Sequence, residues 1–120
     1  MTNEEMDALD RWLAERLMGW KLCFETKEGH YCIPNDDSSI CQVISSIKDW
    51  SPTRNIAQVG AIVGEMRKKG WKWSVLTVSD EDMDKPVNLS GFYKGNLYIV
   101  KKASTIQLST CLAAKVVLRG

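Results

Sequence analysis

The chain has 120 residues, of which 44% are hydrophobic and 26% are charged, and its formal net charge is +1 at pH 7. These values are close to the average for globular proteins, and they predict a single domain, residues 1–120, that can bury a core without a metal or a disulfide. Lysine and arginine are spread along the chain instead of forming a basic run, which argues against binding to an extended nucleic acid.

The first segment predicts a helix over residues 2–18. Its polar, acidic start, TNEE, is unlike a signal peptide, and no apolar run approaches the ~20 residues that cross a bilayer. We therefore expect a cytoplasmic protein with no membrane contact. Thr2 and Glu5 fit a capping box. Apolar residues line one helical face, and the opposite face, which we expect to contact water, carries Asp10, Arg11, Glu15 and Arg16.

The next part of the chain, residues 25–50, has the least regular pattern. Short strands are predicted at 20–24 and 30–33, and residues 40–47 fit either a short helix or an apolar flap. A long irregular segment inside a small domain is often functional, so residues 28–50 are a candidate site region. The pattern leaves open whether this region is a functional loop or a structural flap.

A zinc site can be drawn from Cys23, His30, Cys32 and Cys41. Zinc ligands usually come in close pairs such as C-x2-C, however, and this spacing is absent. We therefore expect no metal and no other cofactor, and we expect reduced cysteines that are buried as small apolar residues. Whether these four residues come together stays open.

Residues 51–78 predict a helix, a glycine turn and a strand. The Ser51-Pro52-Thr53 triplet is a helix-start pattern, Gly70 ends the helix, and residues 71–78 alternate as a strand does. Gly60 and Gly64 lie on one face of this helix, and each costs about 1 kcal/mol relative to alanine. They predict the close approach of another backbone, either within the fold or across a symmetric dimer.

The last third of the chain predicts a hairpin and a helix after an acidic stretch at 80–85. Strands at 89–93 and 97–100 flank a turn at 94–96. The final helix begins at Ser104, where Ser104 and Gln107 fit a capping box, and its wide apolar surface predicts deep burial or a subunit interface. The elements together predict an α/β (α+β) sandwich with three main helices and a small, mostly antiparallel sheet.

Three stretches, in this order, resemble the phage ABA-sandwich domain family of small phage and prophage proteins: LDRWLAERLMGW (9–20), SPTRNIAQVGAIVGEMRKKGW (51–71) and STIQLSTCLAAKVVL (104–118). The resemblance covers a little under half of the chain, and it implies an alpha-beta-alpha architecture and a phage origin. Asn55 and Gly60 depart from the family pattern, in which an acidic residue and a tryptophan are common at these positions. The family has no established activity, so it implies no catalytic residue.

The sequence contains no Gly-rich phosphate loop, nucleophile elbow or zincin helix, so we expect that the protein is not an enzyme. One alternative is a pocket for a nucleotide-type ligand, in which aromatic rings stack on the base while cations and helix-start N–H groups contact phosphate. The candidate ligand-binding residues are Lys48, Trp50, Ser51, Arg54, Asn55, Phe92, Tyr93, Lys94 and Tyr98.

The second alternative is an apolar face that binds a host protein. In the phage setting, either kind of binding predicts counter-defence, by sequestering a nucleotide immune signal or by inhibiting a host defence protein. The competing hypothesis is a homo-oligomeric structural or interaction module with no small ligand. A ligand pocket requires aromatic and basic side chains in one cleft, whereas an interaction module requires a flat apolar patch.

Overall fold

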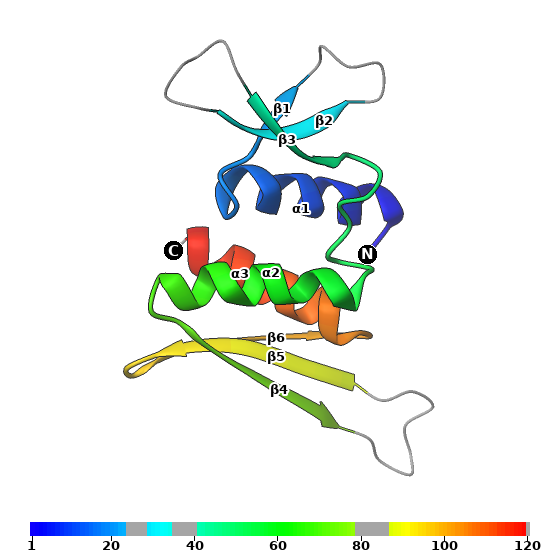
Figure 1. Cartoon of the computed structure of the whole chain (residues 1–120). Helices are drawn as coiled ribbons and strands as arrows, with labels where there is room; N and C mark the ends of the chain where they lie inside the picture. The colour runs from blue at the N-terminus through cyan, green and yellow to red at the C-terminus, as the bar shows by residue number, and fades with distance from the viewer. Residues whose placement is uncertain (24–28, 35–40, 79–86, 120) are drawn as a thin grey trace.

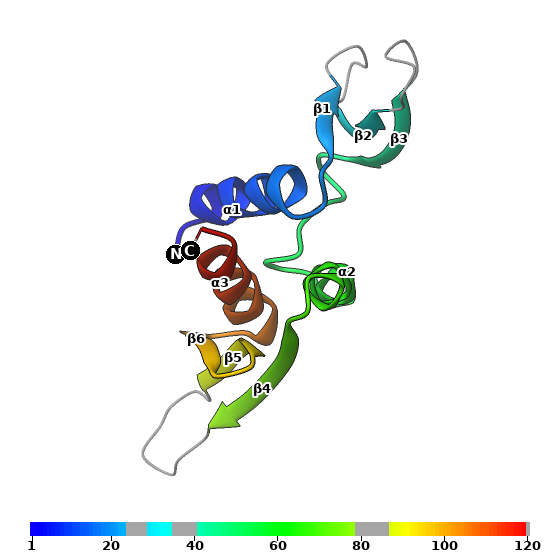
Figure 2. The same cartoon turned by 90° about the vertical axis from the view of Figure 1, so that its left-hand side faces the viewer.

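In the computed structural model, three helices lie between two three-stranded antiparallel sheets (Figures 1 and 2). The structure describes residues 1–23, 29–34, 41–78 and 87–119, and the molecule measures 56 × 33 × 22 Å. Sheet A consists of β1 (Lys21–Cys23), β2 (His30–Pro34) and β3 (Cys41–Ser46). Sheet B consists of β4 (Lys72–Val78), β5 (Val87–Lys94) and β6 (Leu97–Ala103). The helices are α1 (Asn3–Arg16), α2 (Ile56–Lys68) and α3 (Ile106–Arg119).

This arrangement confirms the predicted mixed fold with three helices and antiparallel pairing. The sequence did not predict that the strands form two separate sheets, or that the helices occupy the layer between them (Figure 1). One hydrophobic cluster joins the layers, because it contains residues of all three helices together with Tyr31 of sheet A and Phe92 of sheet B. None of the helices in the described part of the chain is long and apolar enough to span a membrane.

Helix α1 begins as predicted. The Thr2 hydroxyl accepts a hydrogen bond from the Glu5 N–H at 3.1 Å, and the Glu5 carboxylate accepts one from the Thr2 N–H at 3.2 Å. Gly19 follows the helix with a φ of 72°, a backbone conformation that glycine adopts without steric cost. The expectation that Asp10 contacts water is wrong, because only 3% of this residue is exposed. A contact 43 residues away along the chain, described below, buries it.

Sheet A contains the two predicted short strands and a third strand that the sequence did not predict. The helix alternative for residues 40–47 is wrong, because Cys41–Ser46 pairs with β2 as strand β3. This segment contains Val43, Ile44 and two serines, and β-branched side chains favour a strand when a neighbouring strand is available. The region 28–50 therefore supplies two strands of sheet A; residues 28 and 35–40 lie outside the described part, as does the acidic stretch at 80–85.

The proposed zinc ligands belong to this sheet. His30 is the Cα partner of Cys23 in the β1–β2 pairing, and Cys41 is the partner of Pro34 in the β2–β3 pairing. Cys32 and Cys111 are both buried, and burial raises the pKa of Cys111 strongly. The side chains of Cys23 and Cys41 lie outside the described part of the chain, so the expectation about metal binding stays a prediction.

Helix α2 begins four residues later than the sequence predicts, because its N-cap is Asn55 and not Ser51. Ser51 starts a turn, in which its carbonyl oxygen accepts hydrogen bonds from the N–H groups of Arg54 and Asn55. Asn55 is the N-cap, and its side-chain oxygen accepts the Ala57 N–H at 3.0 Å. The Ser51 cap was wrong because Thr53, which the pattern places in the first helical turn, is held by the buried Asp10 instead. Gly70, with a φ of 91°, follows the end of α2, and strand β4 comes next, as predicted.

The two glycines of α2 are not at a close contact. A Cβ placed on Gly60 or Gly64 has no neighbouring atom of the described residues within 4 Å, so the predicted close approach within this part of the fold is wrong. We expect Gly60→Ala and Gly64→Ala each to raise the free energy of unfolding by about 0.5–1 kcal/mol, measured by urea denaturation, because alanine restricts the unfolded chain and favours the helix. Gly70→Ala is the matched control and should destabilise the fold. A loss of stability at residue 60 or 64 would instead indicate a contact with a second copy.

Helix α3 packs against the inner face of sheet B. The Trp73 indole N–H donates to the Thr110 hydroxyl at 3.2 Å, and the Ser109 hydroxyl donates to the Ser90 hydroxyl at 2.6 Å. The helix begins at Ile106, and the Thr105 hydroxyl accepts the Leu108 N–H, so the N-cap lies one residue after the predicted one. The deep-burial interpretation of this helix is confirmed, because its buried residues include Cys111, Ala113 and Ala114.

Candidate functional site

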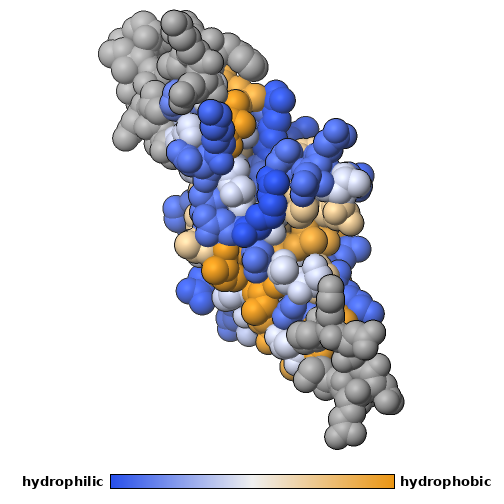
Figure 3. Space-filling view, turned by 90° about the vertical axis from the view of Figure 1, so that its right-hand side faces the viewer, coloured by the Kyte–Doolittle hydropathy of each residue, from blue (hydrophilic) through white to orange (hydrophobic). Residues whose placement is uncertain are grey.

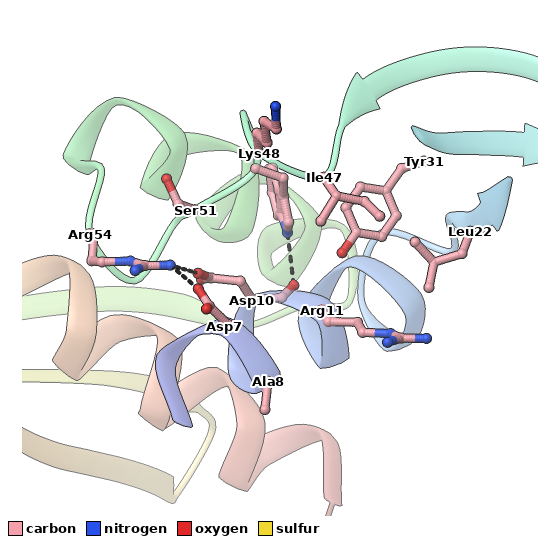
Figure 4. Close-up of a pocket in the computed structure, with 11 residues that line it drawn as sticks. Asp7, Ala8, Asp10, Arg11, Leu22, Tyr31, Ile47, Lys48, Ser51 and Arg54 are labelled. Carbon is pink, nitrogen blue, oxygen red and sulfur yellow. Dashed lines mark hydrogen bonds and ion pairs between the residues drawn. The ribbon is translucent and has the colours of Figure 1, made fainter. Parts of the chain in front are cut away.

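A cleft of about 500 Å³ lies between α1 and the segment that joins sheet A to α2 (Figure 4). Four of the sequence-predicted site residues line it, namely Lys48, Trp50, Ser51 and Arg54. The opposite wall comes from α1, which contributes Asp7, Asp10 and Arg11, and from sheet A, which contributes Leu22 and Tyr31. The last residues of the candidate region 28–50 therefore do reach a concave surface.

Asp10 organises this cleft. Its carboxylate accepts hydrogen bonds from the backbone N–H and the hydroxyl of Thr53, both at 2.9 Å. Its backbone carbonyl accepts the indole N–H of Trp50 at 2.8 Å. Three interactions thus tie one residue of α1 to the segment that precedes α2. Because Asp10 and Thr53 are both almost fully buried, this network fixes the position of the segment.

The charges of the cleft largely offset one another. The Arg54 guanidinium pairs with the carboxylate of Asp7 and lies 3.4 Å from that of Asp10. The hydrogen bond that Arg54 donates to Asp7 is the first cause that raises the pKa of Arg54. Burial raises the pKa of Asp10, and the hydrogen bonds from Thr53 and the charge of Arg54 partly offset that rise. A phosphate at Arg54 would have to displace two carboxylates, and Figure 4 shows the Lys48 amine pointing away from them.

The predicted aromatic contacts with a base are not available in this cleft. Trp50 is 6% exposed and packs edge-on against Trp20 with ring centroids 4.7 Å apart, so its faces are occupied by the core. Phe92 is 0% exposed and also belongs to the core. These two residues are corrected from candidate base-stacking groups to core residues. Asn55 caps α2 instead of lining the cleft.

The remaining predicted site residues lie beyond the helical layer, in sheet B. Lys94 at the end of β5 donates to the Lys69 carbonyl at 3.1 Å, and its amine lies 6.0 Å from the centre of the Trp71 ring. Tyr93 and Tyr98 are paired on neighbouring strands, with ring centroids 6.1 Å apart. The structure therefore does not bring the nine predicted residues together in one pocket. Four line the cleft, four belong to sheet B, and Asn55 is the N-cap of α2.

Tyr93 and Tyr98 belong to a second surface, the outer face of sheet B. Alternate residues of a strand point to opposite faces, and Trp73, Ser90 and Phe92 point toward the helices. The residues with the other parity therefore form the outer face, which contains Lys72, Ser74, Leu76, Val78, Val87, Leu89, Gly91, Tyr93, Tyr98, Val100 and Lys102. No described helix covers this face (Figures 1 and 2).

The outer face is apolar, exposed and ordered by local contacts. Leu76 is 59% exposed and Tyr98 is 57% exposed. The Tyr98 and Ser74 hydroxyl groups are hydrogen-bonded at 2.7 Å, and the Lys72 amine lies 5.9 Å from the centre of the Tyr93 ring. A Cβ at Gly91 would collide with the Ile99 carbonyl oxygen, so the sheet centre admits no side chain there. From the right-hand side of Figure 1, apolar residues also appear between the polar ones across the middle and lower parts of the molecule (Figure 3).

Sequence reasoning recognised the tyrosines but missed this surface. The available signal was the double-sided apolar pattern of β4 and β5, in which Leu76 pairs with Leu89 and Val78 pairs with Val87 on the side opposite Trp73 and Phe92. A sheet that is apolar on both faces needs two covering layers. The predicted helices were assigned to cover the sheet, and only the structure shows that they all lie on the inner side of sheet B.

No protein-family model matches this sequence, and no curated protein matches it. The resemblance to the phage ABA-sandwich domain family therefore stays a prediction from the sequence.

Proposed function

We propose that this protein is a non-enzymatic binding protein that docks onto a partner protein through the outer face of sheet B. The observation that carries the proposal is an uncovered sheet face with exposed apolar and tyrosine side chains, opposite a face on which the helices lie. Exposed apolar patches of this kind mark interaction surfaces, and tyrosine is enriched among residues that dominate binding energy.

The charges of sheet B define the partner's chemistry. Strands β4, β5 and β6 contain four lysines and no aspartate or glutamate. Lys72 and Lys102 belong to the outer face itself. A complementary surface is therefore apolar at its centre and carries carboxylates at its rim. A second copy stacked on this face would oppose lysine to lysine, so a different protein fits better.

The predicted phage setting suggests what such a partner does. In a phage protein, this surface would inhibit a host defence protein in the bacterial cytoplasm. Sequestration of a nucleotide signal has less support, because Trp50 and Phe92 are core residues and because Arg54 is already paired with carboxylates. A flat apolar patch was the feature expected of an interaction module.

The test uses one outer-face variant and one matched control. Leu76→Asp adds a carboxylate to the apolar centre of the face, and Ile56→Asp adds the same group to a 54%-exposed residue at the start of α2, where a negative charge suits the helix dipole. Partners captured from a bacterial lysate are purified, and their affinity is measured by calorimetry for the wild type and both variants. We expect a loss of about tenfold or more for Leu76→Asp and no change for Ile56→Asp.

Two results would overturn the proposal. One is a purified partner whose affinity is the same for the wild type and for Leu76→Asp, when circular dichroism shows that the variant is folded. The other is native mass spectrometry of the purified protein that shows a bound nucleotide which denaturation releases. The second result would favour the nucleotide alternative and direct attention to the cleft.

A further inference from the structure

Sheet B has two edges that differ in their chemistry. Its strand order, β4-β5-β6, leaves β4 and β6 each with one side that pairs with no strand in the described part of the chain. An edge strand presents free backbone N–H and C=O groups that can pair with another strand, and proteins usually protect such edges with lysine, proline or a bulge.

Strand β6 carries this protection and β4 does not. Lys101 and Lys102 are adjacent in the second half of β6, which is the other edge strand. In β4, the only charged residue is Lys72 at its start, and residues 73–78 contain neither a charge nor a proline. The β4–β5 register runs without a shift from the Lys72–Tyr93 pair to the Val78–Val87 pair, so β4 also has no bulge.

The second half of β4 is exposed on both of its faces. Leu76 on the outer face is 59% exposed, and Val75 on the inner face is 37% exposed. Helix α3 packs on β5 and β6, and β4 extends past the helical layer (Figure 2). An uncharged, regular edge strand with exposed branched side chains on both faces is suited to pair with another strand.

We propose that the β4 edge pairs antiparallel with β4 of a second copy, which joins the two sheets B into one six-stranded sheet. A two-fold axis makes this contact self-complementary, because each residue opposes its counterpart across the axis. A two-fold axis near Leu76 places Val75 of one copy opposite Thr77 of the other. Residues 73–78 contain no charged residue, so no like charges oppose one another in this span. In the same pairing of two β6 edges, an axis between Lys101 and Lys102 would oppose each of these lysines to a lysine of the second copy.

This dimer would extend the outer face without covering it. Two outer faces would lie side by side on one continuous sheet, so a partner with two sites would bind both with increased avidity. The dimer itself does not depend on the proposed partner protein, and its test requires none.

The experiment measures the mass of the purified full chain in solution over a concentration series, by light scattering and by native mass spectrometry. Val75→Lys places a charge on the β4 edge, and Val78→Lys is a second variant nearer the strand end, where the wild-type residue is 36% exposed. Leu97→Lys adds the same charge to β6, at a residue that is 62% exposed and not on the outer face. Circular dichroism establishes that each variant is folded.

We expect a dimer for the wild type and for Leu97→Lys, and dimerisation weakened by about tenfold or more for Val75→Lys and Val78→Lys. A wild-type protein that stays monomeric over the whole series would overturn the proposal. A dimer that persists in both folded β4 variants would overturn it too. If Tyr98→Asp gives monomers while the β4 variants stay dimeric, the outer face is the contact between copies and the edge is not.

Discussion

Replacing Phe92 with alanine is expected to lower the free energy of unfolding by about 3–5 kcal/mol, one of the two largest effects we predict for a single substitution. Phe92 is 0% exposed and lies in β5, the central strand of sheet B, where it pairs with Trp73 and Ile99 on the inner face. Its removal leaves a cavity between the sheet and the helical layer, because surrounding residues from separate elements cannot close the space together. Urea denaturation followed by tryptophan fluorescence measures the change.

Tyr98→Ala is the matched control for this prediction. Tyr98 lies on the neighbouring strand but points to the outer face, and it is 57% exposed. We expect its loss to change the free energy of unfolding by less than about 1 kcal/mol, because it removes one hydroxyl contact and part of an exposed ring pair. Equal effects for the two substitutions would show that the assignment of inner and outer faces is incorrect.

Asp10→Ala is expected to lower the free energy of unfolding by about 2–4 kcal/mol. The substitution leaves the backbone N–H and the hydroxyl of Thr53 buried without their acceptor, and Thr53 is only 2% exposed. Arg54 keeps its contact with Asp7, so the loss comes mainly from the two buried hydrogen bonds. Asp10→Asn retains an oxygen acceptor for the Thr53 N–H, and we expect a smaller loss, about 1–2 kcal/mol.

The wild type and Asp10→Asn together test how the titration of Asp10 affects the stability of the fold. Because burial raises the pKa of Asp10, the folded chain holds this proton to a higher pH than the unfolded chain does. The resulting contribution to stability is fully present below the ordinary value of 3.8 and is lost as the pH rises through the raised pKa. The unfolding free energy of the wild type minus that of Asp10→Asn should therefore fall with pH in this window. A difference that rises with pH would show that hydrogen bonds to Asp10 outweigh its burial.

Glu5 provides the opposite case within the same chain. The hydrogen bond from the Thr2 backbone lowers the pKa of Glu5. The contribution of Glu5 to stability is therefore fully present above the ordinary value of 4.5 and is lost as the pH falls through the lowered pKa. Both proteins in the comparison retain Glu5, and its effect cancels from the difference. The comparison thus isolates Asp10.

Local patterns determined where most elements form. The Thr2–Glu5 capping box, the glycine turns at residues 19 and 70 and the hairpin around Gly95 all depend on interactions within a few residues, and all are present in the structure. The starts of α2 and α3 were displaced because more than one side chain nearby is able to cap a helix. At α2, the choice depended on Asp10, which lies more than 40 residues away along the chain.

The candidate sites depended on packing between distant segments. The sequence correctly indicated that Lys48, Trp50, Ser51 and Arg54 lie near one another, because they are close in the chain. It could not indicate that Trp50 and Phe92 face the core while Tyr93 and Tyr98 face outward on the other side of the helical layer. An aromatic residue has the same local signature whether it packs inside or stacks on a ligand.

The sequence by itself determined the types and order of the elements other than β3, together with the antiparallel character of the strand pairing, since hydrophobic periodicity, caps and turns act over short distances. Only the tertiary structure decided that the strands divide into two sheets, that all three helices lie between them and that Asp10 is buried. Burial and layer order depend on which apolar faces pack together. A strand such as β4, which has apolar side chains on both faces, is compatible with more than one order of the layers. In this fold, Trp73 on the inner face of β4 contacts α3, and Leu76 on its outer face stays exposed.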